Sequence, residues 1–131
     1  MKITADTNVL VRAVVRDDTS QTSAAVSILH EAELIALPLP CLCELAWALR
    51  SVYSFSKTEI TTAIEALLQA SNVVVDAPAA EAGLQVLRAG GDFADGAIAY
   101  VGRWMGGQMF VSFDKKAVSI LAANGQNAKL L

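Results

Sequence analysis

The sequence has little of the chemistry that most hydrolases and transition-metal centres use. It contains one histidine, His30, and two cysteines, Cys41 and Cys43, in 131 residues. A lone histidine without a second ligand type nearby argues against a Ser-His-Asp or Cys-His hydrolase, and we interpret it as a solvated helix position. Cysteines two residues apart on a helix point in different directions. We therefore interpret both as small core residues, with metal ligation as the alternative.

Long apolar runs are also absent. No segment reaches the roughly 18 uncharged apolar residues of a membrane span. The nearest, Leu34–Leu49, is interrupted by Pro38, Pro40 and Glu44. No apolar core of a signal peptide follows the first residue, so we expect a cytoplasmic protein without membrane association. No glycine-rich loop follows a predicted strand, which argues against a nucleotide-binding protein.

Charge is sparse as well, because charged residues make up only 18% of the chain and the formal net charge is −3. Taken alone, this acidic balance argues against a nucleic-acid-binding surface. Apolar residues make up 54%, which predicts helices buried on several sides or an extensive oligomer interface. The length predicts one domain, residues 1–131, with a substantial core.

Short apolar segments alternate with helical patterns along the chain. Strands are predicted at 2–5, 34–38, 72–76 and 108–113, with a short edge strand at 128–131. Helices are predicted at 7–16, 20–32, 40–52, 56–70, 77–91, 92–107 and 114–125. Thr19 and Ser20 are the capping residues expected for the second helix, and Ser56 with Glu59 has the spacing of a capping box. Apolar strands separated by helices predict an α/β fold with a mostly parallel sheet covered on both faces.

Five acidic residues stand near predicted strand ends and helix starts. Asp6 directly follows the first strand and Asp114 the fourth. Asp92 and Asp95 lie in the first turn of the helix that leads to the fourth strand, and Glu44 lies one turn into the helix after the second. In open parallel sheets, ligands bind beyond the carboxyl ends of the strands. The positions therefore predict a common site for these acids.

Each acid also has a purely structural interpretation. Asp6, Asp92 and Asp114 could be helix caps, and Asp95 could be an acid favoured by the helix dipole. Taken singly, capping is the more frequent role for such an aspartate. Glu44 is harder to explain in this way, because its helical neighbours at three and four residues offer no charge and the stretch PCLCELAWAL has no polar face.

Carboxylates that converge at one sheet edge repel one another and raise each other's pKa. A divalent cation removes this conflict, and oxygen ligands without histidine or cysteine favour Mg²⁺ or Mn²⁺. Helix N-termini near Asp6, Asp95 and Asp114 would help to keep these groups ionised. We therefore expect Glu44 to be tolerated in an apolar helix because it reaches a metal cluster.

Four stretches, TADTNVLV, CELAWAL, GGDFADGAIAY and FVSFDKKA, together resemble a PIN-domain ribonuclease. They occur in the order and spacing of that family over essentially the whole chain, and the resemblance is closest to VapC-type toxins of type II toxin–antitoxin pairs. It assigns the four family acids to Asp6, Glu44, Asp95 and Asp114. Asp92 is then an accessory acid or a cap, and Ser112 is a hydroxyl that positions a water or ligand.

The resemblance implies a three-layer α/β/α sandwich with a central, mostly parallel sheet of four to five strands. It also implies an endoribonuclease that uses Mg²⁺ or Mn²⁺ and leaves a 3′-hydroxyl and a 5′-phosphate. Its partners would be the RNA substrate, a second copy in a homodimer and a cognate VapB-like antitoxin. Gly96 departs from the family, which commonly has alanine there, and would loosen the helix start by up to about 1 kcal/mol.

Hydrolysis of a phosphodiester needs an activated water and stabilised charge on the phosphate, and one or two metals supply both. We expect Asp6 and Asp95 to be direct ligands, and Asp114 and Glu44 to act through bound waters. Thirteen acidic residues less these four leave nine, against ten lysines and arginines. Of these, Lys115, Lys116, Arg12 and Arg16 lie beside the acids and either contact phosphates or form solvated helix faces.

Two other functions remain open at this point. One is a catalytically silent PIN-like regulatory or binding module, in which the acids only cap helices. The other is a Mg²⁺-dependent phosphohydrolase for small phosphoesters, which is disfavoured because Asp6 is followed by Thr7 and Asn8 rather than by an Asp-x-Asp motif.

Aromatic residues on or just after the helix of Glu44 have two interpretations. Trp47, Tyr53 and Phe55 are either core residues or part of a dimer or antitoxin interface. Core packing is favoured for Trp47, because aromatic side chains most often serve the core.

Overall fold

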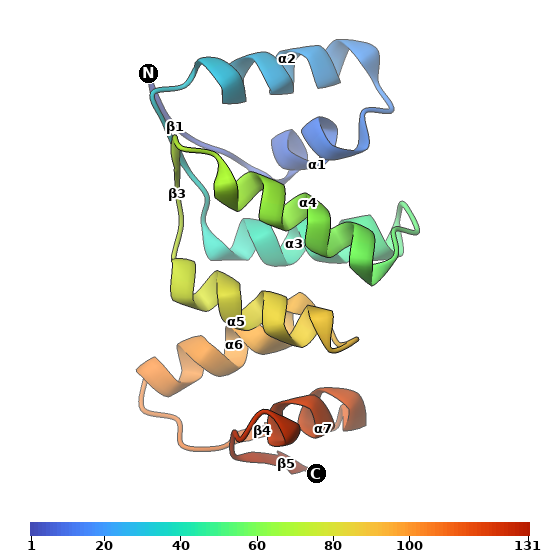
Figure 1. The fold of residues 1–131 in the computed structure, drawn as a ribbon, viewed down its shortest axis with the longest axis vertical. Helices are drawn as coiled ribbons and strands as arrows, with labels where there is room; N and C mark the ends of the chain where they lie inside the picture. The colour runs from blue at the N-terminus through green and yellow to red at the C-terminus, as the bar shows by residue number, and fades with distance from the viewer. The chain divides into compact units, whose positions relative to one another are not determined.

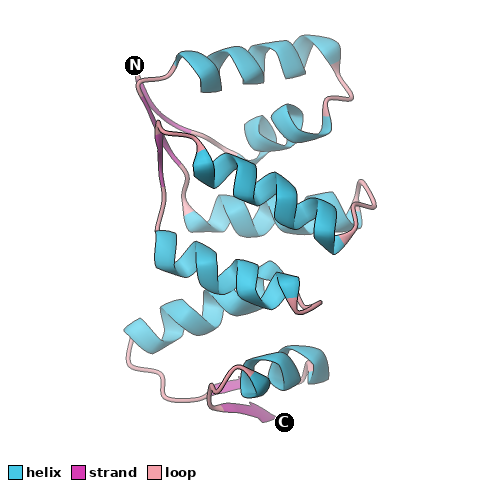
Figure 2. Ribbon diagram, in the orientation of Figure 1, coloured by secondary structure: helices cyan, strands magenta, loops and turns pink.

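The computed structural model describes residues 1–131 and divides them into two compact units, Met1–Asp76 and Ala77–Leu131. Each unit has its own parallel sheet and its own helices (Figures 1 and 2). We call them the first and the second unit. The assignment of the chain to one domain stays a prediction.

The first unit contains three strands and four helices. They are β1 (Lys2–Thr4), α1 (Thr7–Val15), α2 (Thr19–Glu31), β2 (Leu34–Ala36), α3 (Leu39–Ser51), α4 (Lys57–Gln69) and β3 (Val73–Val74). β2 lies between β1 and β3, and both pairings are parallel. Ile35 on β2 pairs with Ile3 and Val73 and is buried at the centre of the sheet. The helices close the core with buried Leu10, Leu42, Leu45, Leu49, Ile60 and Ile64.

The second unit contains three helices and two strands. They are α5 (Ala77–Arg88), α6 (Phe93–Trp104), β4 (Phe110–Ser112), α7 (Lys115–Ala123) and β5 (Ala128–Leu130). β4 and β5 are parallel, with Phe110 opposite Ala128. Phe110 packs on a buried cluster of Val86, Ala99 and Leu121, one residue from each helix. The strands and all three helices therefore share one small core.

Helices α5 and α6 pack with their backbones nearly in contact. A Cβ atom built on Gly96 of α6 would lie 2.2 Å from the carbonyl oxygen of Ala82 and 2.9 Å from the Cα of Gly83. A Cβ on Gly83 would lie 2.6 Å from the ring of Phe93. Glycine at position 96 therefore allows the close approach of α5, which offsets the helix-propensity cost expected there. This contact also fixes the first turn of α6, which carries Asp95.

The predicted α/β class with parallel strands is confirmed. Every predicted helix and strand is present, and the five strands form a three-stranded and a two-stranded sheet. The capping box of Ser56 and Glu59 is confirmed. The expected cap of α2 was wrong, because the Asp18 carboxylate accepts the hydrogen bond from the backbone N–H of Gln21 at 2.9 Å, ahead of Thr19. None of the helices has both the length and the hydropathy to cross a membrane.

Candidate metal centre

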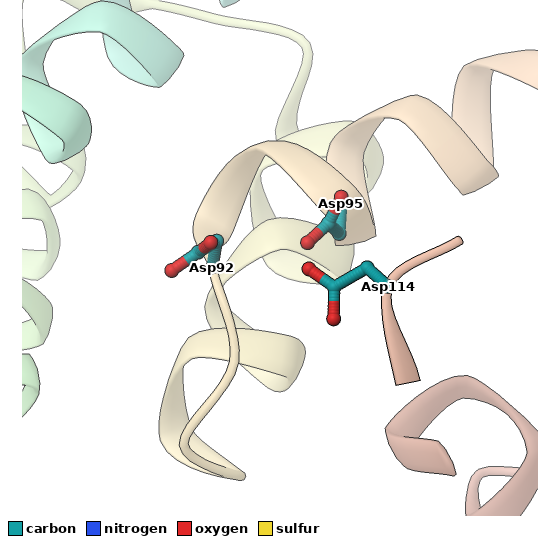
Figure 3. Close-up of side chains that lie close together, drawn as sticks. All are labelled: Asp92, Asp95 and Asp114. Atoms are coloured by element: carbon teal, nitrogen blue, oxygen red, sulfur yellow. The ribbon is translucent and has the colours of Figure 1, made fainter. Parts of the chain in front are cut away.

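Three aspartates of the second unit lie close together (Figure 3). Asp92 and Asp95 come from the start of α6, and Asp114 comes from the turn between β4 and α7. One carboxylate oxygen of each lies within 4.8 Å of the others. Asp92 and Asp114 are exposed, and Asp95 is half-buried. Carboxylates at this spacing repel one another unless a cation joins them, and oxygen ligands suit a hard divalent cation.

Asp114 is held by the turn that it terminates. Its Oδ1 accepts hydrogen bonds from the backbone N–H groups of Lys116 at 3.0 Å and Ala117 at 3.1 Å, so Asp114 caps α7. Its own backbone N–H donates to the Oγ of Ser112 at 3.0 Å. Both capping bonds use Oδ1, which leaves Oδ2 for another ligand. Ser112 thus fixes the backbone at Asp114, while its expected role in positioning a water stays a prediction.

Asp92 and Asp95 are positioned by the start of α6. Asp92 occupies the N-cap position, but its side chain makes no capping hydrogen bond. Its carbonyl oxygen accepts from the backbone N–H of Asp95 at 3.2 Å, which sets the first turn. The expected capping role therefore applies to the side chain of Asp114 and not to that of Asp92. Asp92 lies in one group with Asp95 and Asp114, and its role as an accessory acid stays a prediction.

A lysine side chain lies beside the loop that leads into Asp92. A Cβ atom built on Gly90 would be 3.7 Å from the Cε of Lys116 and 3.8 Å from its Nζ. The Lys116 side chain therefore reaches from α7 to the loop that leads into Asp92. A lysine at this position can contact a phosphate next to the carboxylates.

The first unit brings Asp6 and Glu44 together through a threonine. Asp6 caps α1, because its Oδ1 accepts from the backbone N–H of Thr7 at 2.8 Å. The Oγ1 of Thr7 donates to the Oε2 of Glu44 on α3 at 3.1 Å. Both acids line a hollow of about 360 Å³, with Arg12 and Tyr53 also in its wall. Sequence reasoning missed Thr7, although its hydroxyl directly after Asp6 was a visible signal.

The inference that the helix of Glu44 has no polar face was wrong. The buried face of α3 is formed by Leu42, Leu45 and Leu49, whereas Glu44 is exposed. Trp47 is 66% exposed, so the favoured core role for this residue was also wrong. Exposure and the bond from Thr7 explain why Glu44 is tolerated in α3. Its role as a metal ligand stays a prediction.

Two groups near Asp6 and Glu44, the Cys43 thiol and the Arg12 guanidinium, have shifted pKa values. Burial, and then the charge of Glu44, raise the pKa of the Cys43 thiol, which keeps it protonated at neutral pH. The hydrogen bond to Asp17, at 2.7 Å, raises the pKa of the Arg12 guanidinium. Arg12 is thus engaged by Asp17, which favours the solvated-face interpretation over a phosphate contact.

The structure thus brings together Asp92, Asp95 and Asp114 in one unit, and Asp6 and Glu44 in the other. The prediction that Asp6, Glu44, Asp95 and Asp114 form one cluster stays a prediction. Within the second unit, the arrangement offers three carboxylates and an adjacent lysine. This set can hold a divalent cation and a phosphate.

Comparison with known families identifies the class of the protein. The model of the PIN domain family matches residues 3–121, so the chain belongs to the PIN domain family. Its α/β fold with parallel strands is of the PIN type. PIN domains are generally nucleases, which are hydrolases, and typically use divalent metals. No curated protein and no solved structure matched the chain.

Proposed function

We propose that this chain is a metal-dependent endoribonuclease that cleaves RNA phosphodiesters with a metal-activated water, and that it is a VapC-type toxin of a toxin–antitoxin pair. The observation that carries the proposal is the convergence of Asp92, Asp95 and Asp114 in a chain of the PIN domain family. The resemblance of the four acidic stretches to VapC-type toxins supports the finer assignment.

The proposed catalytic and metal-binding residues are Asp6, Glu44, Asp95 and Asp114, with Asp92 and Ser112 as accessory residues. The proposed cofactor is Mg²⁺ or Mn²⁺, because the ligand set consists of carboxylate oxygens. When bound, such an ion lowers the pKa of a water and neutralises charge on the phosphate.

The residues of the second unit have distinct tasks in this proposal. Asp95 would hold the cation directly and Asp114 would hold it through a bound water, and the capping bonds of Asp114 Oδ1 keep its carboxylate in place without rearrangement. Asp92 would add a further carboxylate oxygen as an accessory residue. Lys116 offsets the negative charge of the incoming phosphate.

The proposed protein partner is a VapB-like antitoxin. The first unit has an apolar groove of about 1050 Å³ lined by α1, α2, α4 and the strands β2 and β3. Leu10, Ile35 and Leu37 line it and are buried, while His30 and Glu59 add polar groups. A groove of this kind suits the apolar face of an amphipathic helix. A short antitoxin encoded beside the gene would supply such a helix.

The proposed oligomer is a homodimer, and the proposed location is the cytoplasm, where RNA and an antitoxin are available. Trp47 and Val52 are exposed at and just after α3 of the first unit and would be covered in a dimer. Large exposed apolar side chains of this kind are enriched at interfaces.

One observation favours a second candidate function, that of a catalytically silent PIN-like binding module. Asp6 and Asp114 both cap helices, so two of the four proposed catalytic acids already have a structural role. In such a module, these two aspartates would only cap helices.

RNA cleavage separates the two candidates. The purified chain is incubated with total RNA and Mn²⁺, with and without EDTA, beside Asp95→Asn and the control Glu31→Gln, an exposed acid on α2. The nuclease proposal predicts cleavage by the wild type and by Glu31→Gln, and loss of cleavage with Asp95→Asn or EDTA. Wild-type protein that is folded and leaves every RNA intact would favour the binding module.

A further inference from the structure

One aromatic residue directly precedes Asp114 in the sequence, and its side chain is exposed to solvent. Phe113 is 81% exposed and stands between Ser112 and Asp114. The backbone on both sides is fixed, because Asp114 N–H donates to Ser112 Oγ and Asp114 Oδ1 accepts from two N–H groups of α7. The ring is therefore presented from an ordered turn.

The same turn in the first unit has no such ring. There, β1 is followed by Ala5 and the capping Asp6, and here β4 is followed by Phe113 and the capping Asp114. Ala5 is 1% exposed, and its backbone N–H donates to the carbonyl of Ala36 at 3.1 Å. A turn of this kind therefore forms without a large side chain at the residue between the strand and the aspartate. The turn itself does not account for Phe113.

Two lysines follow Phe113 closely in the sequence. Lys115 and Lys116 follow Asp114 and are exposed, and the Lys116 ammonium lies beside Gly90 on the loop to Asp92. An aromatic ring next to lysines is the combination that binds single-stranded nucleic acid, because bases stack on the ring and phosphates contact the cations.

We propose that Phe113 is a positioning residue for RNA, whose ring stacks on a nucleobase next to the phosphate engaged by the three aspartates. The inference rests on the proposed nuclease function and deepens it. Stacking needs a base that is free of its own helix, so the site would take single-stranded RNA in preference to a duplex.

The test compares variants at Phe113 with a matched aromatic in the same unit. Trp104 is 77% exposed and ends α6, which begins beside Asp92, so Trp104→Ala serves as the control. Trp104 lies nine residues after Asp95, about 13 Å along the helix. KM and kcat are measured with Mn²⁺ on a short fluorescent single-stranded RNA and on the same RNA in a duplex. The fluorescence of 2-aminopurine in the single strand reports stacking.

Phe113→Ala should raise KM for the single strand roughly tenfold to hundredfold and leave kcat near the wild-type value. Phe113→Tyr and Phe113→Trp should restore KM, and Phe113→Leu should not. Quenching of 2-aminopurine should be lost in Phe113→Ala and kept in Phe113→Trp. Trp104→Ala should match the wild type, and thermal unfolding of every variant should stay unchanged.

Three results would overturn the inference. One is an unchanged KM in Phe113→Ala, and another is rescue by leucine as well as by tyrosine. The third is a large loss of thermal stability in Phe113→Ala, because it would identify a packed core side chain. If the wild type cleaves RNA and Phe113→Ala has the same KM, this inference is wrong and the proposed function stands. If the wild type cleaves no RNA, the proposed function and this inference are both wrong.

Discussion

The turns at Asp6 and Asp114 are built in the same way but have different neighbours. In both, one residue separates the end of a strand from an aspartate, and the aspartate caps the next helix through its side chain. Asp6 reaches one other acid, Glu44, through the hydroxyl of Thr7. Asp114 has two carboxylates within 4.8 Å. Both units contain a turn capped by an aspartate. The two turns differ in the elements that pack beside them.

The cap at Asp114 does not occupy the whole carboxylate. The capping bonds of Asp114 both fall on Oδ1. An N-cap therefore orients a carboxylate and leaves its second oxygen for a cation. What makes the second turn a candidate metal centre is the nearby start of α6, which Gly96 allows to pack against α5.

The largest expected effect comes from Gly96→Ala, which would disturb the second turn and leave the first unit intact. The added Cβ meets backbone atoms of α5, so the two helices must separate, at a cost of about 2–3 kcal/mol. We expect a lower melting temperature and weaker Mn²⁺ binding, measured by calorimetry. The matched control is Gly102→Ala on the same helix, where a Cβ meets nothing within 4 Å. That variant should gain up to about 1 kcal/mol, and equal losses in both would contradict the packing argument.

A smaller effect separates the capping role from the ligand role at the two turns. Asp114→Ala and Asp6→Ala should each lose about 1 kcal/mol in denaturant unfolding, because each removes a cap. Asp114→Asn and Asp6→Asn should retain that stability, because the amide oxygen still accepts the capping bond. Asp114→Asn should nevertheless lose Mn²⁺ affinity. Retained affinity there would mean that Asp114 is a cap only.

The smallest effect concerns the pKa of Cys43. Burial is the larger cause of its raised pKa and the Glu44 charge the smaller, so Glu44→Gln should lower the pKa slightly. In a Cys41→Ser background, the alkylation rate of Cys43 is measured against pH. The rate profile should shift to lower pH in Glu44→Gln, because the thiolate forms more readily. An unchanged profile would show that the Glu44 carboxylate does not act on this thiol.

The parts of the fold that depend on local sequence could be predicted. Strand positions, helix starts and the capping box follow from alternation and from capping residues a few positions apart. The rule about strand ends placed Asp6 and Asp114 at the carboxyl ends of their strands, whereas the common site of all the acids stays a prediction.

What could not be predicted depends on contacts between elements. The composition of α3 gives no polar stripe, so it did not show that Glu44 and Trp47 face solvent. The role of Gly96 requires knowing that α5 passes beside it. Asp18 was missed as a cap because three polar residues in a row, at 18–20, can each fill that position.

The most direct measurement is Mn²⁺ binding by titration calorimetry on the wild-type chain, Asp95→Asn, Asp114→Asn and the control Glu31→Gln, with folding checked by circular dichroism. We predict that the wild type and Glu31→Gln bind Mn²⁺ equally and that both aspartate variants lose binding while remaining folded. Equal binding by all four proteins, or none by the folded wild type, would contradict a metal centre at Asp92, Asp95 and Asp114.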